Sequence, residues 1–207
     1  MKKERRFISE ILIAASLLMT IGCDLTGDGG SDSGKIYSIG DTGPSGVGIV
    51  FYVTDGGLHG LEVAPEDQGT NVVWSNNNVD LVNGSSALPD EIGTGSANTD
   101  AIINQPGNDD CAALRCRNYR AAEEGDWFLP SRNELKAIWD NLVDDGSGST
   151  TESTNNGVGN FATTWSYWSS SESSVDKAWL QSFYNGNDGV DSKTTETFVR
   201  FRAVRAF

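Results

Sequence analysis

The chain has 207 residues, of which 37% are hydrophobic, and a formal net charge of -14 from 15 basic and 29 acidic side chains. This acidic excess leaves no broad basic surface to neutralise phosphates, which excludes nucleic-acid binding through counterion release and disfavours other polyanions as ligands. Because His59 is the single histidine, sites that need two imidazoles, including most zinc hydrolase sites, are excluded as well.

The first 22 residues have the layout of a bacterial secretion signal. A basic stretch over residues 1–6 precedes a mostly apolar run over residues 7–21, which is too short for a comfortable membrane span. The run ends in Gly22-Cys23, and a small residue directly before a cysteine resembles the lipobox of bacterial lipoproteins, in which the thiol receives a diacylglyceryl group. We therefore predict cleavage after residue 22 and lipidation of Cys23. The lipid would anchor the protein in the cell envelope, on the periplasmic or surface face of a bacterial membrane; the alternative is an ordinary signal peptide with an incidental cysteine.

A polar spacer follows the predicted lipid attachment point. Residues 23–35 are rich in Gly, Ser and Asp and lack apolar periodicity, so we expect a flexible tether there and one folded domain over residues 36–207. Cleavage after residue 22 removes four basic and two acidic side chains, which leaves 11 basic and 27 acidic ones and a charge of -16.

The folded part begins with a predicted hairpin. Residues 47–53 and 58–64 are compatible with β-strands, and the segment between them, Thr54-Asp55-Gly56-Gly57, is typical of a turn. Residues 71–95 are dominated by Asn, Gly and Ser and are expected to be irregular, apart from one short strand considered at residues 72–74.

Two to three helices are predicted in the middle of the chain. Residues 97–104 and 111–122 suit helices, with Asp109 and Asp110 as candidate caps of the second. The strongest local signal is Ser131-Arg132-Asn133-Glu134, a capping box that begins a helix. The apolar residues that follow fall at i, i+3, i+4 and i+7 and predict one buried stripe, made of Leu135, Ile138, Trp139 and Leu142.

The last third of the chain is predicted to be mostly β-structure. A polar loop over residues 144–159 precedes strands over residues 165–171, 178–184 and 198–207, with a turn at 185–189. Strands at both ends of the domain with helices between them predict an α+β fold with long irregular loops, in which the terminal strands pair.

Two cysteines remain inside the predicted domain. Cys111 and Cys116 are five residues apart, a spacing that separates the two Cα atoms too far for an unstrained disulfide on one regular helix. An exported compartment permits disulfides, and a bridge becomes feasible if Cys111 lies just before the helix. Otherwise Cys116 is a small buried residue and Cys111 a free thiol; the sequence leaves both alternatives open.

Few residues support catalysis. His59 lies just past the hairpin turn, where a lone histidine is usually a surface or structural residue, and no second general base lies near it in the sequence. Glu123, Glu124 and Asp126 are close neighbours in one turn and do not face each other across a substrate as a glycosidase pair does. We therefore expect a protein that is not an enzyme.

Calcium is the one cofactor that the sequence leaves open. The best local cluster of oxygen ligands is Asn185, Asn187, Asp188 and Asp191, but no D-x-[DN]-x-[DN]-G loop is present. A polar β-turn explains these residues better than a metal site does. We expect no cofactor, with calcium as the alternative.

Six aromatic residues gather in the segment from residue 165 to residue 184. They are Trp165, Tyr167, Trp168, Trp179, Phe183 and Tyr184. Aromatic faces stack on the C–H surfaces of sugar rings, but aromatic residues also fill small β-cores. We expect most of the six to belong to the core, with Tyr167 and Tyr184 as the members more suited to the surface. Arg200, Arg202 and Arg205 suit half-buried structural cations as well as ligand contacts.

Several ordered motifs resemble one bacterial family. The segments at 125–135 (GDWFLPSRNEL), 167–172 (YWSSSE), 178–179 (AW) and 199–207 (VRFRAVRAF) look like the Lcl C-terminal domain family, named from a collagen-like adhesin. Motifs over residues 39–65 and 92–99 are similar to an N-terminal half often attached to it, so the resemblance covers residues 36–207. It implies a C-type-lectin-like fold. Structural roles are predicted for Trp127, Pro130, Ser131, Glu134, Arg202 and Arg205.

The resemblance implies an adhesin-like or glycan-binding module. We expect a non-catalytic binding or adhesion function, with glycans or surface molecules of a host or neighbouring cell as ligands. The candidate ligand-binding residues are Tyr167, Trp168, Trp179, Tyr184, Asn185, Asn187 and Asp188. Because this chain lacks a collagen-like stalk and is strongly acidic, glycosaminoglycan binding by the namesake does not carry over. The alternatives are a structural envelope lipoprotein and an enzyme similar to formylglycine-generating enzymes, whose active-site cysteine arrangement is not recognisable here.

Overall fold

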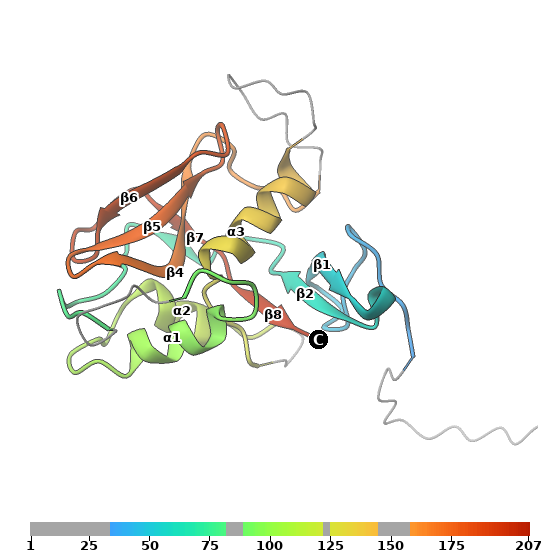
Figure 1. Ribbon diagram of the computed structural model, residues 1–207, viewed down its shortest axis with the longest axis horizontal. Coiled ribbons are helices and arrows are strands. Elements are labelled where there is room, and N and C mark those ends of the chain that lie inside the picture. The colour runs from blue at the N-terminus through green and yellow to red at the C-terminus, as the bar shows by residue number, and fades with distance from the viewer. Residues whose placement is uncertain (1–33, 82–88, 122–124, 145–157) are drawn as a thin grey trace, which may run out of the picture. The chain divides into compact units, whose positions relative to one another are not determined.

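The structure is a computed structural model that describes residues 34–81, 89–121, 125–144 and 158–207 (Figure 1). The predicted signal peptide, Cys23 and nearly all of the tether lie outside these residues, as do Glu123, Glu124 and most of the predicted loop at 144–159. Among the described residues, none of the helices has the length and apolar character that a membrane crossing requires.

The first sheet joins the two ends of the domain. Strands β1 (Ile49–Thr54) and β2 (His59–Val63) form the predicted antiparallel hairpin, closed by a short 3₁₀ turn, Asp55–Gly57. Strand β8 (Val204–Ala206) then pairs antiparallel with β2, so that the sheet has the order β1-β2-β8. The prediction that the terminal strands pair is confirmed.

The second sheet has five strands in the order β3-β7-β4-β5-β6. They are β3 (Gly69–Thr70), β4 (Ser166–Ser174), β5 (Lys177–Ser182), β6 (Asp188–Ser192) and β7 (Arg200–Phe201). The segment predicted as one strand over 198–207 is interrupted at Arg202 and Ala203, and its halves, β7 and β8, belong to different sheets. The short strand considered at 72–74 is irregular, and β6 was not expected.

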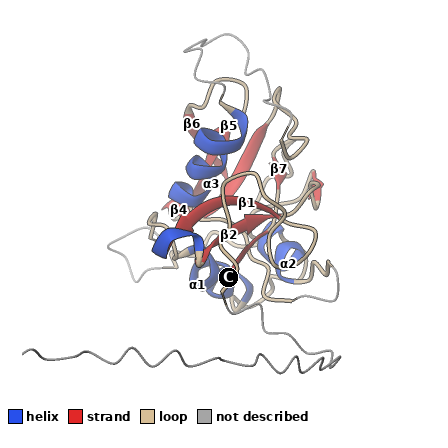
Figure 2. Cartoon of the chain, turned by 90° about the vertical axis from the view of Figure 1, so that its right-hand side faces the viewer, coloured by secondary structure: helices blue, strands red, loops and turns tan. Residues whose placement is uncertain are grey.

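Three helices cover the sheets, which confirms the α+β class. Helices α1 (Gly95–Ile103) and α2 (Ala112–Arg117) pack on each other, and α1 also packs on β4. Helix α3 (Arg132–Ile138) continues as a π-helical turn, Trp139–Val143, and packs against β1, β4 and β5 (Figure 2). The N-cap of α2 is Cys111, so the prediction that Asp109 or Asp110 caps it is wrong. Asp110 instead forms a two-bond ion pair with Arg115.

The capping box positions α3 as predicted. The Ser131 hydroxyl accepts a hydrogen bond from the Glu134 amide at 3.2 Å, and the Glu134 carboxylate accepts from the Ser131 amide at 2.7 Å. That carboxylate also accepts from the Gly93 amide at 2.8 Å, which ties the preceding loop to the helix. Gly95 lies so close that a Cβ there would come within 2.2 Å of Glu134 Oε2, so only glycine fits. Burial raises the pKa of Glu134.

The apolar stripe of α3 and the predicted structural residues lie in the core. Leu135, Ile138, Trp139 and Leu142 are all buried, as the periodicity predicted. The same holds for Trp127, Pro130 and Ser131. The core has two clusters of buried residues: Trp127 and Trp168 belong to one, and the α3 stripe and Tyr167 to the other.

Arg202 and Arg205 lie where the C-terminal chain passes between the sheets. The Arg202 side chain is only 2% exposed, and its Nε donates to Asp67 Oδ1 at 2.7 Å. Arg202 also donates to the carbonyls of Gly159 and Asn160. Arg205 donates to the fully buried Glu62 at 3.0 Å. Both arginines therefore form ion pairs with carboxylates, those of Asp67 and Glu62.

A further buried ion pair holds the irregular loop before α1 in place. Lys193 and Glu172 pair with side chains 0% and 2% exposed. The Lys193 ammonium also donates to the carbonyls of Val79 and Val175, while Glu172 accepts from the Leu81 amide at 3.2 Å. Because every ammonium proton has an acceptor, the burial of this charge is compensated.

The cysteines of the domain are both free and buried. Cys111 has extended backbone as the N-cap of α2, and Cys116 lies in the last turn of that short helix. Of the two alternatives that the sequence left open, the structure has the unbridged one. Burial raises the pKa of both thiols.

We predict that Asp67→Ala destabilises the domain strongly. The change leaves the guanidinium of Arg202 buried without its carboxylate partner, and losing one member of a buried pair typically costs about 3–5 kcal/mol. Urea denaturation would measure the free energy of unfolding. The control is Asp140→Ala, which removes an exposed pair with Lys136 and should cost no more than about 0.5 kcal/mol. Equal losses in the two variants would contradict the structural role of Asp67.

We also predict that both thiols resist alkylation in the folded protein at pH 8. The raised pKa values keep them protonated, and burial denies the reagent access. Because ionisation favours the unfolded chain, the stability linked to these thiols is present below their unfolded pKa and is lost as the pH rises through the folded pKa. Mass spectrometry after iodoacetamide treatment should find Cys111 and Cys116 unmodified without denaturant and modified in guanidinium. Rapid labelling of the folded chain would contradict the prediction.

Candidate functional site

Two predicted ligand-binding aromatics lie in the core. Tyr167 and Trp168 are both 0% exposed, so the prediction that they bind a ligand is wrong, as is the placement of Tyr167 on the surface. The physical reason is that β4 is an inner strand of its sheet with a cluster of the core on each face. Successive side chains of the strand point to opposite faces, so Tyr167 lies in one buried cluster and Trp168 in the other. The Tyr167 hydroxyl donates to Asp67 at 3.2 Å and accepts from the Ala162 amide at 2.9 Å.

Trp179 is partly exposed, but one face of its ring is covered. The Arg132 guanidinium carbon lies 3.7 Å from the ring centroid, a close cation–π contact. Arg132 also donates to Asp188 at 2.6 Å and to Asp90 at 3.1 Å. The predicted residues Trp179 and Asp188 are thus brought together, yet their main partner is the arginine at the start of α3.

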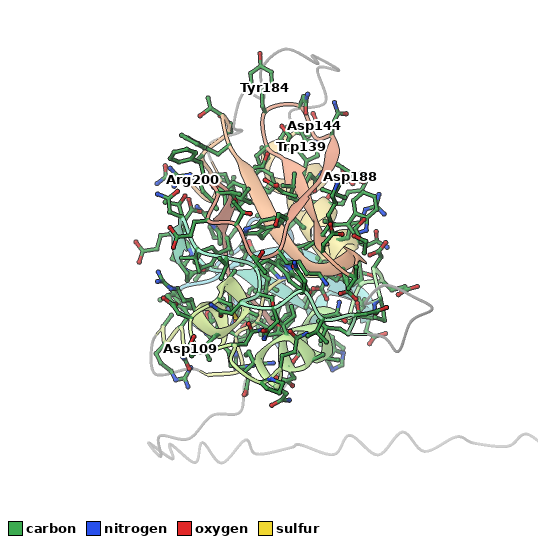
Figure 3. All side chains as sticks on the ribbon, turned by 90° about the vertical axis from the view of Figure 1, so that its left-hand side faces the viewer. Asp109, Trp139, Asp144, Tyr184, Asp188 and Arg200 are labelled. Atoms are coloured by element: carbon green, nitrogen blue, oxygen red, sulfur yellow. The ribbon has the colours of Figure 1, made fainter. Side chains whose placement is uncertain are left out.

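The tip of the β5–β6 hairpin carries the rest of the predicted set. Tyr184 is 39% exposed and points away from the sheet at the top of Figure 3, as the surface prediction required. Asn185 accepts from the Asn187 amide at 3.1 Å, which is an Asx turn. Within the part of the chain that the structure describes, no group of three or more His, Cys, Asp and Glu side chains is placed to hold a metal ion.

The structure reveals an aromatic cleft beside this hairpin, which we call the Trp165 cleft. It has a volume of about 460 Å³, and its two aromatic side chains are Trp165, 39% exposed, and Phe198, 69% exposed. The two ring centroids lie 6.0 Å apart at an interplanar angle of 46°. Of the six tryptophans, Trp165 is the most exposed. A pair of accessible rings in a hollow is a suitable surface for stacking on a ligand.

Neighbouring groups hold Trp165 in place. Its backbone amide donates to the Ala162 carbonyl at 3.1 Å, and its carbonyl accepts from the Phe183 amide at 2.9 Å. The Arg200 guanidinium lies 5.4 Å from the ring centroid and is itself paired with Asp67 at 2.8 Å. The ring is therefore presented by a hydrogen-bonded backbone immediately before β4.

The polar lining of the Trp165 cleft consists of oxygen groups. It is made of Thr164, Ser166, Asp191, Glu196 and Thr197. The Thr197 hydroxyl is buried and has no hydrogen-bond partner among the described residues. Hydroxyl and carboxylate oxygens beside an aromatic pair can accept hydrogen bonds from a ligand whose apolar face stacks on the rings.

The sequence pointed to Trp165 but missed its partners. Trp165 belongs to the aromatic group that was weighed between core and sugar stacking, whereas Phe198 was interpreted as the first residue of a strand. Phe198 instead precedes β7, at the end of a polar segment that begins after β6. That polar run, Lys193 to Thr197, was the available signal that Phe198 stands in a loop and not in a buried strand.

His59 lies apart from these aromatics, on the first hairpin. Its ring nitrogen Nδ1 is 3.0 Å from the carboxylate of Asp55, and both side chains are well exposed, at 63% and 70%. A shallow hollow of about 180 Å³ is lined by His59, Tyr52 and Phe207. The prediction of a surface histidine in this turn is confirmed.

Comparison with known proteins identifies the family. The model of the Lcl C-terminal domain matches residues 64–205, which include the Trp165 cleft, all three helices and the whole second sheet. No curated protein matches the chain. Since the matched segment spans more than half of the sequence, this chain belongs to the Lcl C-terminal domain family.

Proposed function

We propose that this protein is an exported, lipid-anchored protein of the cell envelope whose domain binds glycans without catalysis, as a binding or adhesion module. The observation that carries the proposal is the exposed Trp165–Phe198 pair in a cleft of about 460 Å³. Exposed aromatic rings leave apolar surface in contact with water, which is unfavourable. A ligand that stacks on these rings would bury that surface.

Sugar rings match the chemistry of the cleft. One face of many sugars is a sheet of C–H groups that stacks on Trp and Phe, while the ring hydroxyls donate to carboxylates such as Asp191 and Glu196. The lining contains no lysine or arginine, and the chain carries a net charge of -14, so sulfated or acidic glycans are repelled. Uncharged glycans are the favoured class.

The composition of the cleft also supports binding over catalysis. Its lining has neither a histidine nor a cysteine, and the single histidine of the chain lies on the separate β1–β2 hairpin. Asp191 Oδ1 already accepts from the Ser192 amide at 2.7 Å. A binding module is therefore favoured over an enzyme that resembles formylglycine-generating enzymes.

We predict that Trp165→Ala and Phe198→Ala each weaken glycan binding at least tenfold, which corresponds to about 1.4 kcal/mol. A glycan array of uncharged oligosaccharides, followed by calorimetric titration of the best binders, would measure the loss. The matched control is Tyr184→Ala, which removes an aromatic ring of the same exposure, 39%, outside the cleft.

Repeating the titration with calcium and with EDTA tests the metal alternative. We expect the same affinity in both, because the oxygen groups of the β5–β6 turn are engaged with Asn187 and Arg132. Unchanged binding in the Trp165 and Phe198 variants would remove the cleft as the site. No binding to any glycan by the wild-type chain would favour a purely structural envelope protein.

The anchoring half of the proposal has its own prediction. If Cys23 carries the lipid, Cys23→Ala releases the protein from the membrane pellet into the soluble fraction, and radiolabelled palmitate is no longer incorporated. A Cys111→Ala variant, which changes a buried thiol of the domain, should stay in the pellet and keep the label. Palmitate incorporation that survives the Cys23 change would show that lipid is attached elsewhere.

A further inference from the structure

Two further hollows lie next to the Trp165 cleft. A second hollow, of about 220 Å³, shares Glu196 with it and also contains Asp110 and Arg115. A third, of about 410 Å³, shares Arg115 with the second. The three hollows are therefore neighbours that share lining residues, Glu196 between the first and second and Arg115 between the second and third, and we call this series of hollows the groove.

Both ends of this groove carry aromatic rings. Trp165 and Phe198 lie at one end, and Tyr119, partly exposed, lies in the third hollow. The Tyr119 ring is held edge-on against the buried Trp127 ring, with centroids 5.2 Å apart and an interplanar angle of 82°. Rings fixed at separate points along a groove suit a ligand that repeats the same flat unit.

The middle of the groove is polar and fixed by an ion pair. Arg115 donates two hydrogen bonds to Asp110, at 2.8 and 2.9 Å, although the two side chains remain 42% and 62% exposed. Asn118 lines the third hollow next to them. Figure 3 shows Arg200, which lies against Trp165, and Asp109, the neighbour of Asp110, on the same side of the domain, with Asp188 on the other.

The charge of the groove restricts what it can bind. Of its acidic residues, Asp67 is paired with Arg200 and Arg202, and Asp110 with Arg115. Three further carboxylates, Glu66, Asp191 and Glu196, have no ion-pair partner among the described residues. Carboxylates without cations accept hydrogen bonds from hydroxyl groups and repel acidic chains.

We infer that this groove binds an extended, uncharged oligosaccharide, whose successive rings lie from Trp165 and Phe198, past Glu196 and Arg115, to Tyr119. The inference rests on the proposed function, since it takes the Trp165 cleft as one end of the same site. It adds the length of the ligand and the residues that contact its far part.

A length series tests the inference. Cello-oligosaccharides and N-acetylated chito-oligosaccharides of two to six units would be titrated calorimetrically against the full chain. In the series that binds, we expect affinity to rise at least tenfold from the disaccharide to the hexasaccharide. Arg115→Ala and Asn118→Ala should each lower hexasaccharide affinity about five- to tenfold and leave disaccharide affinity unchanged. Trp165→Ala should weaken both, and Lys177→Ala, outside the groove, neither.

The outcomes separate the two proposals. Affinity that does not depend on oligosaccharide length would overturn the inference of an extended groove. Hexasaccharide affinity that is unchanged in the Arg115→Ala and Asn118→Ala variants would do the same. Either result would leave the proposal of a site at the Trp165 cleft intact. If neither oligosaccharide series binds and the glycan array shows no binding to any uncharged glycan, both the groove and the proposed glycan-binding function are overturned. A Lys/Arg-rich peptide that binds in place of the sugars, with affinity falling steeply as salt is added, also overturns the inference, because attraction of charge would then be the basis of recognition. Circular dichroism of each variant confirms that it is folded.

Discussion

The other parts of the structure depend on the ion pairs that the Asp67 carboxylate forms with two arginines. This carboxylate pairs with Arg200 and Arg202 at the place where the C-terminal chain leaves one sheet for the other, and it accepts a hydrogen bond from the Tyr167 hydroxyl. Two guanidinium groups would repel each other at this depth without a shared anion. The same carboxylate reaches the candidate site, because the Arg200 that it holds lies against the ring of Trp165. The ion pairs that stabilise the fold and the proposed ligand site therefore share the Asp67 carboxylate.

Local signals predicted those elements whose stabilising partners lie nearby in the sequence. The hairpin at β1 and β2 follows from its turn residues, and α3 follows from a capping box in which Ser131 and Glu134 satisfy each other's amides. The segment 198–207 was predicted as one strand, but it is broken at Arg202 into β7 and β8. The break depends on a distant group, because Arg202 is buried by pairing with Asp67, 135 positions earlier. No pattern within the segment 198–207 contains that information.

The aromatic residues show the same limit for the site. Trp165 and Trp168 are three positions apart and have the same chemistry, yet one is 39% exposed and the other 0%. The sequence of a strand shows which side chains share a face. It does not show that both faces of β4 are covered, because the covering helices and loops come from elsewhere in the chain. The cleft likewise needs Phe198, which is brought to Trp165 from 33 positions away.

The way in which residues 200–207 complete both sheets has a consequence for folding. Strand β7 fills the place between β3 and β4, and β8 pairs with β2 and bridges to Phe128. Until the last eight residues are available, each sheet lacks a member and the two core clusters cannot close. Loss of these few residues is therefore more damaging to the fold than their number suggests, because both sheets lose a strand at once.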